Sequence, residues 1–221
     1  VYGCNNLLQL AVQKQIERFL LTSSVEIYGE GSKTPMSESY MGYIDCNNAR
    51  SGYNEAKRTC EALCQSYRVQ YGVDSVVVRL ARVFGADNKK DSKAMSQFME
   101  KAVLGEDIIL KSRGLQRYSY CYVADAASAI INVLINGKNG ESYNVADEDE
   151  NMTLGEYAEY IAGLSDRKVI MQIEDNNSVS KAMYALLDIS KIKKIGWSPI
   201  YSVKDALNKT FLIYKERNQS N

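Results

Sequence analysis

Residues 51–80 read SGYNEAKRTCEALCQSYRVQYGVDSVVVRL, and they carry the strongest structural signal in the chain. No proline interrupts residues 51–71, and Gly72 follows them, the residue type that most often ends a helix. Residues 75–80, SVVVRL, are β-branched and nearly all apolar, which is typical of a strand buried on both faces. The stretch therefore predicts a long helix over 51–71 and a buried strand over 75–80.

The same alternation continues in both directions from this stretch. Predicted helices cover 5–15, 94–104, 125–135, 153–164 and 203–216, with a short one between Asp188 and Gly196; predicted strands cover 18–22, 107–110, 118–123, 142–146 and 168–173. Thr153 and Glu156 have the spacing of a capping box. Within 118–123, three tyrosines alternate with Ser119, Cys121 and Val123, so they share one face of the strand. Apolar strands linked by helices predict a parallel sheet with helices on both faces.

Composition excludes several classes of function. The chain has 221 residues, enough for one or two domains, with 27 basic and 27 acidic side chains, so a nucleic-acid partner is disfavoured. It contains no histidine, which excludes Ser-His and Cys-His catalysis and His-ligated metal sites, and no metal is expected. Five cysteines without a C-x-x-C motif suggest reduced thiols and a cytoplasmic setting. No apolar run is long enough to span a membrane, so no membrane association is expected.

Three polar stretches stand out as candidates for chemistry. Residues 22–29, TSSVEIYG, follow a predicted buried strand, and ligands of open α/β sheets bind at the carboxyl ends of strands. Tyr53 and Lys57 lie four residues apart on one helical face, where the ammonium would lower the pKa of the phenol and suit it to take a proton. Residues 116–125, QRYSYCYVAD, place Arg117 before a strand, a suitable position for binding phosphate. Each stretch alone is better explained as ordinary surface structure.

Taken together and in this order, the three stretches resemble the extended short-chain dehydrogenase/reductase family, in its NAD-dependent epimerase/dehydratase group that acts on nucleotide sugars. Further matches to the family pattern are PMSE at 35–38, VVRLARVFG at 77–85 and GESYNVAD at 140–147. The resemblance spans residues 1 to about 165. It implies a partial doubly wound, Rossmann-type parallel sheet with a smaller α/β substrate-binding lobe.

The resemblance also implies catalytic roles. Ser24 is the expected catalytic hydroxyl, Tyr53 the base, and Lys57 the lysine that binds the cofactor ribose. Glu26 falls where dehydratases and sugar-uronate decarboxylases of the family place a functional Glu. Val25 replaces the Asp that serves dehydratases as a general acid, and ARSGYNEAKR at 49–58 looks closest to the decarboxylase branch. The implied reaction is oxidation at sugar C4 followed by epimerisation, dehydration or decarboxylation.

Binding roles follow from the same resemblance. The implied cofactor is NAD, and the expected cofactor-binding residues are Thr22, Ser23, Tyr53 and Lys57. Arg117 is expected to hold the diphosphate of a nucleotide-sugar substrate, with Arg82 as a second substrate contact where the family often has Asn. A cytoplasmic homodimer that serves polysaccharide biosynthesis is implied, with pairing through helices 5–15 and 51–71.

One family feature is missing from these residues. The glycine-rich turn G-x-x-G-x-x-G, which binds the cofactor pyrophosphate, has no counterpart in the sequence. The chain therefore resembles a member without its first βα units. We expect residues 1–85 to belong to the NAD-binding domain, with 118–146 returning to it, and 86–117 and 147–221 to form the substrate lobe. An inactive remnant and a sugar-nucleotide-binding module without redox chemistry remain as alternatives.

Overall fold

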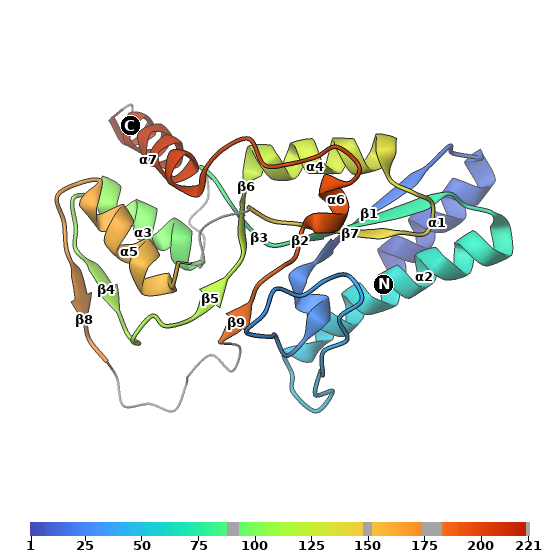
Figure 1. The fold of residues 1–221 in the computed structure, drawn as a ribbon, viewed down its shortest axis with the longest axis horizontal. Helices are drawn as coiled ribbons and strands as arrows, with labels where there is room; N and C mark the ends of the chain where they lie inside the picture. The colour runs from blue at the N-terminus through green and yellow to red at the C-terminus, as the bar shows by residue number, and fades with distance from the viewer. Residues whose placement is uncertain (88–92, 148–151, 174–182, 220–221) are drawn as a thin grey trace.

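The computed structural model describes residues 1–87, 93–147, 152–173 and 183–219 (Figure 1). Its elements, in chain order, are α1 (Tyr2–Lys14), β1 (Phe19–Ser24), the 3₁₀ turn η1 (Val25–Tyr28), α2 (Ser51–Tyr71), β2 (Ser75–Leu80), β3 (Arg82–Phe84), α3 (Ala94–Val103), β4 (Ile108–Leu110), β5 (Arg117–Tyr118), β6 (Tyr120–Tyr122), α4 (Val123–Asn136), β7 (Ser142–Val145), α5 (Leu154–Gly163), β8 (Val169–Met171), β9 (Tyr184–Ala185), α6 (Ser190–Lys193) and α7 (Val203–Gln219). The expected alternation of helix and strand is confirmed.

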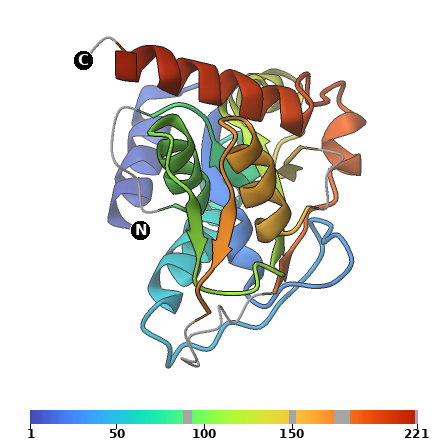
Figure 2. The same ribbon diagram turned by 90° about the vertical axis from the view of Figure 1, so that its left-hand side faces the viewer.

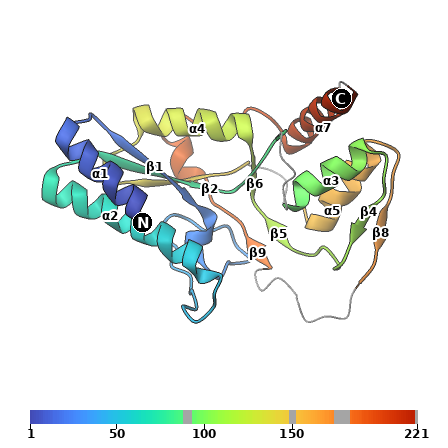
Figure 3. The ribbon, with the colours of Figure 1, turned by 180° about the vertical axis from the view of Figure 1, so that it is seen from behind.

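A parallel sheet of order β1-β2-β7 forms the first half of the molecule. Phe19 and Leu21 contact the small core beneath α1 and α2, whereas Leu20 contacts the core beneath α4. Alternate side chains of one strand thus bury themselves on opposite faces, as the strand period requires. Figure 3 shows α1 and α2 side by side over one face, with α4 beyond the other. This is the doubly wound arrangement that the sequence predicts.

A smaller lobe lies beside the sheet. Helices α3, α5 and α7 enclose its core together with the parallel pair β4–β8. Figure 2 looks onto this lobe, with α7 in red along its upper edge. The segment around α6 belongs elsewhere, because Leu187, Ile189, Ile192 and Trp197 pack into the core of the sheet. The residue boundaries of the two parts stay a prediction.

Strand β6 joins the two cores. Tyr120 and Tyr122 contact the core of the smaller lobe, while Cys121 between them is fully buried in the core of the sheet. The predicted alternation is therefore seen at residues 120–122, where both faces are buried, whereas Val123 already begins α4 and is exposed. Ser119 interrupts the strand, so that β5 and β6 are separate elements with different partners, β9 and β3.

Local signals explain where the main helices begin and end. Gly72 ends α2 in the left-handed region at φ 70°, where glycine is favoured, and its amide donates to the carbonyl oxygen of Arg68. Thr153 and Glu156 form the predicted capping box at the start of α5.

A buried thiol cluster lies between α1 and α2, where burial raises the pKa of Cys64 to about 12 and that of Cys4 to about 11. Within the described ranges, no helix is both long and apolar enough to cross a membrane.

Candidate active site

The candidate site begins at the carboxyl end of β1. Ser24 is the last residue of the strand, and its register partner is Leu80, the last residue of β2. Its hydroxyl oxygen accepts a hydrogen bond from the amide of Glu26 at 3.2 Å, which starts the turn η1. Ser23, one residue earlier, is only 4% exposed, and its hydroxyl has no hydrogen-bond partner within the described residues.

Helix α2 is attached to this strand end on both sides of Ser24. The ammonium of Lys57 donates to the carbonyl oxygen of Thr22 at 2.8 Å, and the amide group of Asn54 donates to the carbonyl oxygen of Glu26 at 2.8 Å. The two bonds fix the first turns of the helix against the strand end. Tyr53, on the same helix, is 54% exposed, and the Lys57 nitrogen lies 5.8 Å from the centre of its ring. An accessible phenol therefore stands beside a cation.

Arg82 comes to the site from β3. One guanidinium nitrogen, Nη2, lies 3.3 Å from a carboxylate oxygen of Glu26. The guanidinium stacks over the ring of Tyr118, with its central carbon 3.8 Å from the ring centre. Its other terminal nitrogen, Nη1, is buried and has no hydrogen-bond partner in the part of the chain that the structure describes. Among the described residues, Arg82 thus has N–H donors that no protein group accepts.

Arg117 lies farther along the same strand system. It precedes Tyr118 in β5, and its amide donates to the carbonyl oxygen of Met183 at 2.9 Å. It also pairs with Thr153 at the start of α5. The pKa of Glu156 is lowered mainly by hydrogen bonds with Thr153, and the charge of Arg117 adds to this effect. Direct contacts thus join Lys57 to Thr22 and Arg82 to Glu26, while Asn54 of α2 links the two pairs and Arg117 is connected to Arg82 through Tyr118.

A second carboxylate lies at the same edge of the sheet. Asp147 follows β7 by two residues, and its carboxylate accepts a hydrogen bond from the amide of Tyr122 at 3.3 Å. Its amide donates to the carbonyl oxygen of Tyr120 at 2.7 Å. Burial raises the pKa of Asp147 to about 7, and the nearby charge of Asp125 contributes to the rise. Asp147 thus titrates near neutrality.

The model of the NAD dependent epimerase/dehydratase family matches residues 1–146. The chain belongs to this family. Among curated relatives, it is 32% identical to UDP-glucuronic acid decarboxylase 3 of Arabidopsis thaliana over 209 residues, which cover 94% of this chain and 60% of that protein. It is 30% identical to UDP-glucuronic acid decarboxylase 1 of Danio rerio, over 94% of this chain and 49% of that protein. The chain thus spans about half to three-fifths of the length of these relatives.

Solved structures of similar shape confirm the fold class. UDP-glucose 4-epimerase of Thermotoga maritima matches all of this chain and 70% of its own, with a TM-score of 0.84 at 22% identity. dTDP-glucose 4,6-dehydratase of Bacillus anthracis, solved in complex with NAD, matches 99% of this chain and 68% of its own, with a TM-score of 0.85 at 23% identity. The family's partial Rossmann-type sheet and smaller lobe are therefore both present in this chain.

Some residues that organise this family member's site were missed from the sequence. Asn54 and Arg58 lie one helical turn apart in α2, and both bind carbonyl oxygens of η1, at Glu26 and Ile27. Their spacing of four residues, next to that of Tyr53 and Lys57, is a signal that could have pointed to them. Asp147 carries no such signal, because its raised pKa arises from burial between segments distant in sequence.

Proposed function

We propose that this chain carries the catalytic and substrate-binding residues of an NAD-dependent enzyme that decarboxylates a nucleotide-linked sugar uronate. The observation that carries the proposal is the attachment of α2 on both sides of Ser24, by Lys57 at Thr22 and by Asn54 at Glu26. This arrangement brings the hydroxyl, the phenol and the ammonium of the expected catalytic set to one edge of the sheet. The relatives named above, UDP-glucuronic acid decarboxylases, favour decarboxylation.

The residues present fit one end of NAD. Lys57 and Tyr53 offer an ammonium and an exposed phenol for the nicotinamide ribose. The buried hydroxyl of Ser23, next to Ser24 in β1, has no hydrogen-bond partner within the described residues. The family's glycine-rich turn for the pyrophosphate is not among these 221 residues. NAD, when bound, supplies a hydride acceptor for sugar C4 and later returns the hydride, so the overall reaction needs no external oxidant.

The chain's own residues would handle the proton. Tyr53 takes the proton of the sugar 4-hydroxyl, and Lys57 stabilises the resulting phenolate through its positive charge. Ser24 lies at the strand end, where its hydroxyl can hydrogen-bond the same sugar oxygen. A ketone at C4 stands β to a carboxylate on C5, and acids of that type readily lose carbon dioxide.

Val25 and Arg82 support the choice of a uronate. Val25 stands where dehydratases carry an acidic residue, so the acid needed for dehydration is missing at that position. One guanidinium nitrogen of Arg82 has no hydrogen-bond partner among the described residues, which makes it a suitable group for binding a substrate carboxylate. Arg117 is proposed to bind the nucleotide diphosphate.

A homodimer is proposed to form through α1 and α2. Their outer faces carry exposed apolar side chains, namely Tyr2, Leu7, Leu10 and Val69. A two-fold contact of this kind would cover the same patch on both subunits.

The free cysteines favour a reducing compartment such as the cytoplasm.

The experiment is incubation of a protein that carries these residues together with the family's glycine-rich turn with NAD and UDP-glucuronate, with the sugar products followed by NMR and released carbon dioxide measured. A UDP-pentose and one equivalent of carbon dioxide are expected. UDP-glucose in a parallel reaction tests for 4-epimerisation instead. Binding of UDP-sugars without any turnover would support the sugar-nucleotide-binding module, and neither binding nor turnover would support the inactive remnant.

A further inference from the structure

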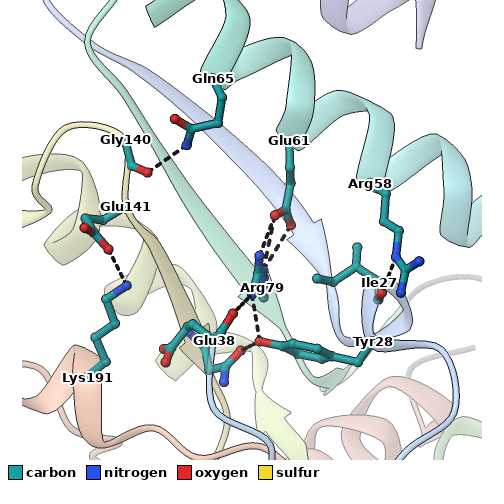
Figure 4. Close-up of polar contacts among 11 residues, drawn as sticks. Ile27, Tyr28, Glu38, Arg58, Glu61, Gln65, Arg79, Gly140, Glu141 and Lys191 are labelled. Carbon is teal, nitrogen blue, oxygen red and sulfur yellow. Dashed lines mark hydrogen bonds and ion pairs between the residues drawn. The ribbon is translucent and has the colours of Figure 1, made fainter. Parts of the chain in front are cut away.

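Arg79 is the centre of a buried polar network next to the candidate site (Figure 4). Its Nε and Nη2 atoms donate to the two carboxylate oxygens of Glu61, at 3.1 and 2.7 Å. Its Nη1 atom donates to the hydroxyl of Tyr28 at 3.0 Å and to the carbonyl oxygen of Glu38 at 2.8 Å. The side chains of Arg79 and Glu61 are only 12% and 13% exposed. This is a desolvated pair with a forked geometry that lysine cannot reproduce.

The network extends from Tyr28 into the sheet. The Tyr28 hydroxyl donates to the side-chain oxygen of Asn144 at 2.6 Å. Asn144, with 0% exposure, donates through its side chain to the carbonyl oxygens of Met36 and Asp188. Its backbone amide donates to the carboxylate of Glu38 at 2.8 Å. Five segments are therefore joined around a single guanidinium, namely α2, η1, the segment of Met36 and Glu38, β7 and the segment of Asp188.

The two residues that Arg79 joins belong to the two halves of the candidate site. Glu61 follows Lys57 by four residues on α2, and hence lies on the same helical face one turn along. Tyr28 follows Ser24 by four residues and ends the turn η1. Arg79 itself sits on β2, next to β1. Arg79 therefore connects helix α2 to the end of η1, in addition to the bonds that Lys57, Asn54 and Arg58 make to the strand end.

Arg79 differs from Arg82 in how many of its N–H donors already bind protein groups. Four of the five N–H donors of the Arg79 guanidinium are used within the protein. Burial alone would lower the pKa of Arg79, but its hydrogen bonds to Glu61 outweigh this and raise it. Removing one partner of such a pair would leave the other charge buried and uncompensated. The group is therefore built to hold structure rather than to bind a ligand.

We propose that Arg79 is a positioning residue that sets the separation between the Ser24 hydroxyl and the Tyr53 phenol. The proposal rests on the proposed function, because both groups are expected to act on one sugar oxygen. Errors of about 1 Å in such a geometry can reduce rates about 100-fold. Arg79 thereby affects turnover without touching substrate or cofactor.

The chain offers a matched control. Arg18 forms the same forked pair with Asp74, with two nitrogen–oxygen distances of 2.9 Å, and also donates to the carbonyl oxygen of Leu134. This pair lies at the amino ends of β1 and β2, beside Phe19 and Ser75, at the opposite edge of the sheet from Ser24. Arg18→Lys therefore weakens a comparable pair without touching the candidate site.

The test compares Arg79→Lys and Arg18→Lys in a protein that also carries the family's glycine-rich turn, assayed with NAD and its nucleotide sugar. For Arg79→Lys, kcat is expected to fall about 10- to 100-fold, while KM for the sugar nucleotide stays within about threefold. For Arg18→Lys, kcat should stay within about twofold at a similar loss of thermal stability. Equal kcat values for the two variants, or losses that follow the change in Tm in both, overturn the proposal.

Two further experiments test the proposal if Arg79→Lys does not fold or if the wild-type protein shows no turnover. If Arg79→Lys does not fold, Tyr28→Phe is used, since it keeps the pair with Glu61 and removes one arm of the network; an unchanged kcat there overturns the proposal. If the wild-type protein turns over no nucleotide sugar, the proposed function fails, and crystal structures then decide the role of Arg79. A change of about 1 Å or more in the Ser24–Tyr53 separation supports it, and an unchanged separation overturns it.

Discussion

Replacing Asp147 by Asn should stabilise the protein at alkaline pH far more than at acidic pH. The pKa of Asp147 rises from 3.8 to about 7 because the carboxylate is buried, and one of its oxygens has no hydrogen-bond partner within the described residues. The folded state therefore holds the proton between pH 4 and pH 7, whereas the unfolded chain has already lost it. The contribution of protonated Asp147 to the free energy of unfolding is fully present below pH 4, and it is lost as the pH rises to about 7.

The magnitude follows from the size of the shift. Each pKa unit corresponds to 1.36 kcal/mol, so a shift from 3.8 to about 7 gives a ceiling of about 4 kcal/mol. At pH 4.5 the cost is only about 1 kcal/mol, because this pH lies less than one unit above the unfolded pKa of 3.8 and the folded state still holds its proton. The gain of Asp147→Asn should thus grow by about 3 kcal/mol between pH 4.5 and pH 8.

Urea unfolding of both proteins at pH 4.5, 6 and 8 measures this difference. Any constant effect of exchanging a carboxyl for an amide is the same at each pH and cancels from the comparison. The amide of Tyr122 can still donate to the asparagine side chain, so the local structure is kept. A gain that is equal at pH 4.5 and pH 8 would refute the reasoning, since it would mean that Asp147 does not release its proton in this range.

Three other outcomes follow from the site and the sheet. In a protein that also carries the family's glycine-rich turn, Tyr53→Phe should reduce kcat by roughly two to four orders of magnitude, and a variant with near-native kcat would remove Tyr53 from the catalytic set. Light scattering of that protein at micromolar concentration should give the mass of a dimer, and a monomer would exclude pairing through α1 and α2. Residues 1–221 alone should show no NAD binding by calorimetry and poor solubility, because the pyrophosphate turn is not encoded in them and β1 pairs only with β2 within the described residues. A micromolar Kd for NAD would contradict this expectation.

Elements with strong local signals could be predicted from the sequence. The bounds of α2 and β2 match the prediction, because Gly72 stops the helix and the β-branched, apolar run SVVVRL is typical of a buried strand. Helix α1 starts earlier than predicted, at Tyr2, because Val1 precedes it without any side-chain cap to mark the start. Strands β3, β5 and β9 have two or three residues each, too few for a period, and they exist only through their partners.

The candidate site likewise contains residues that could be predicted from the sequence and residues that could not. The pair Tyr53 and Lys57 and the hydroxyl of Ser24 were found through spacing and resemblance, and their roles stay predictions. The network of Arg79 could not be found by spacing, since its bonds join residues that are 18 to 51 positions apart and continue to Asn144, 116 positions from Tyr28. Burial and charge compensation become visible only when those segments meet in space.

The distribution of the cysteines allows a fluorescent dye to be attached selectively at one position of the native chain. Cys60, Cys64 and Cys121 are buried, Cys4 is half-buried with a raised pKa, and Cys46 alone among the five is exposed. Thiol reagents attack the thiolate at an accessible sulfur, so a maleimide dye should label Cys46 first. Cys46 lies in the segment that leads into α2, close to Ser51 and the start of the helix that bears Tyr53. A single fluorophore could therefore follow ligand binding at this end of the sheet without any engineered residue.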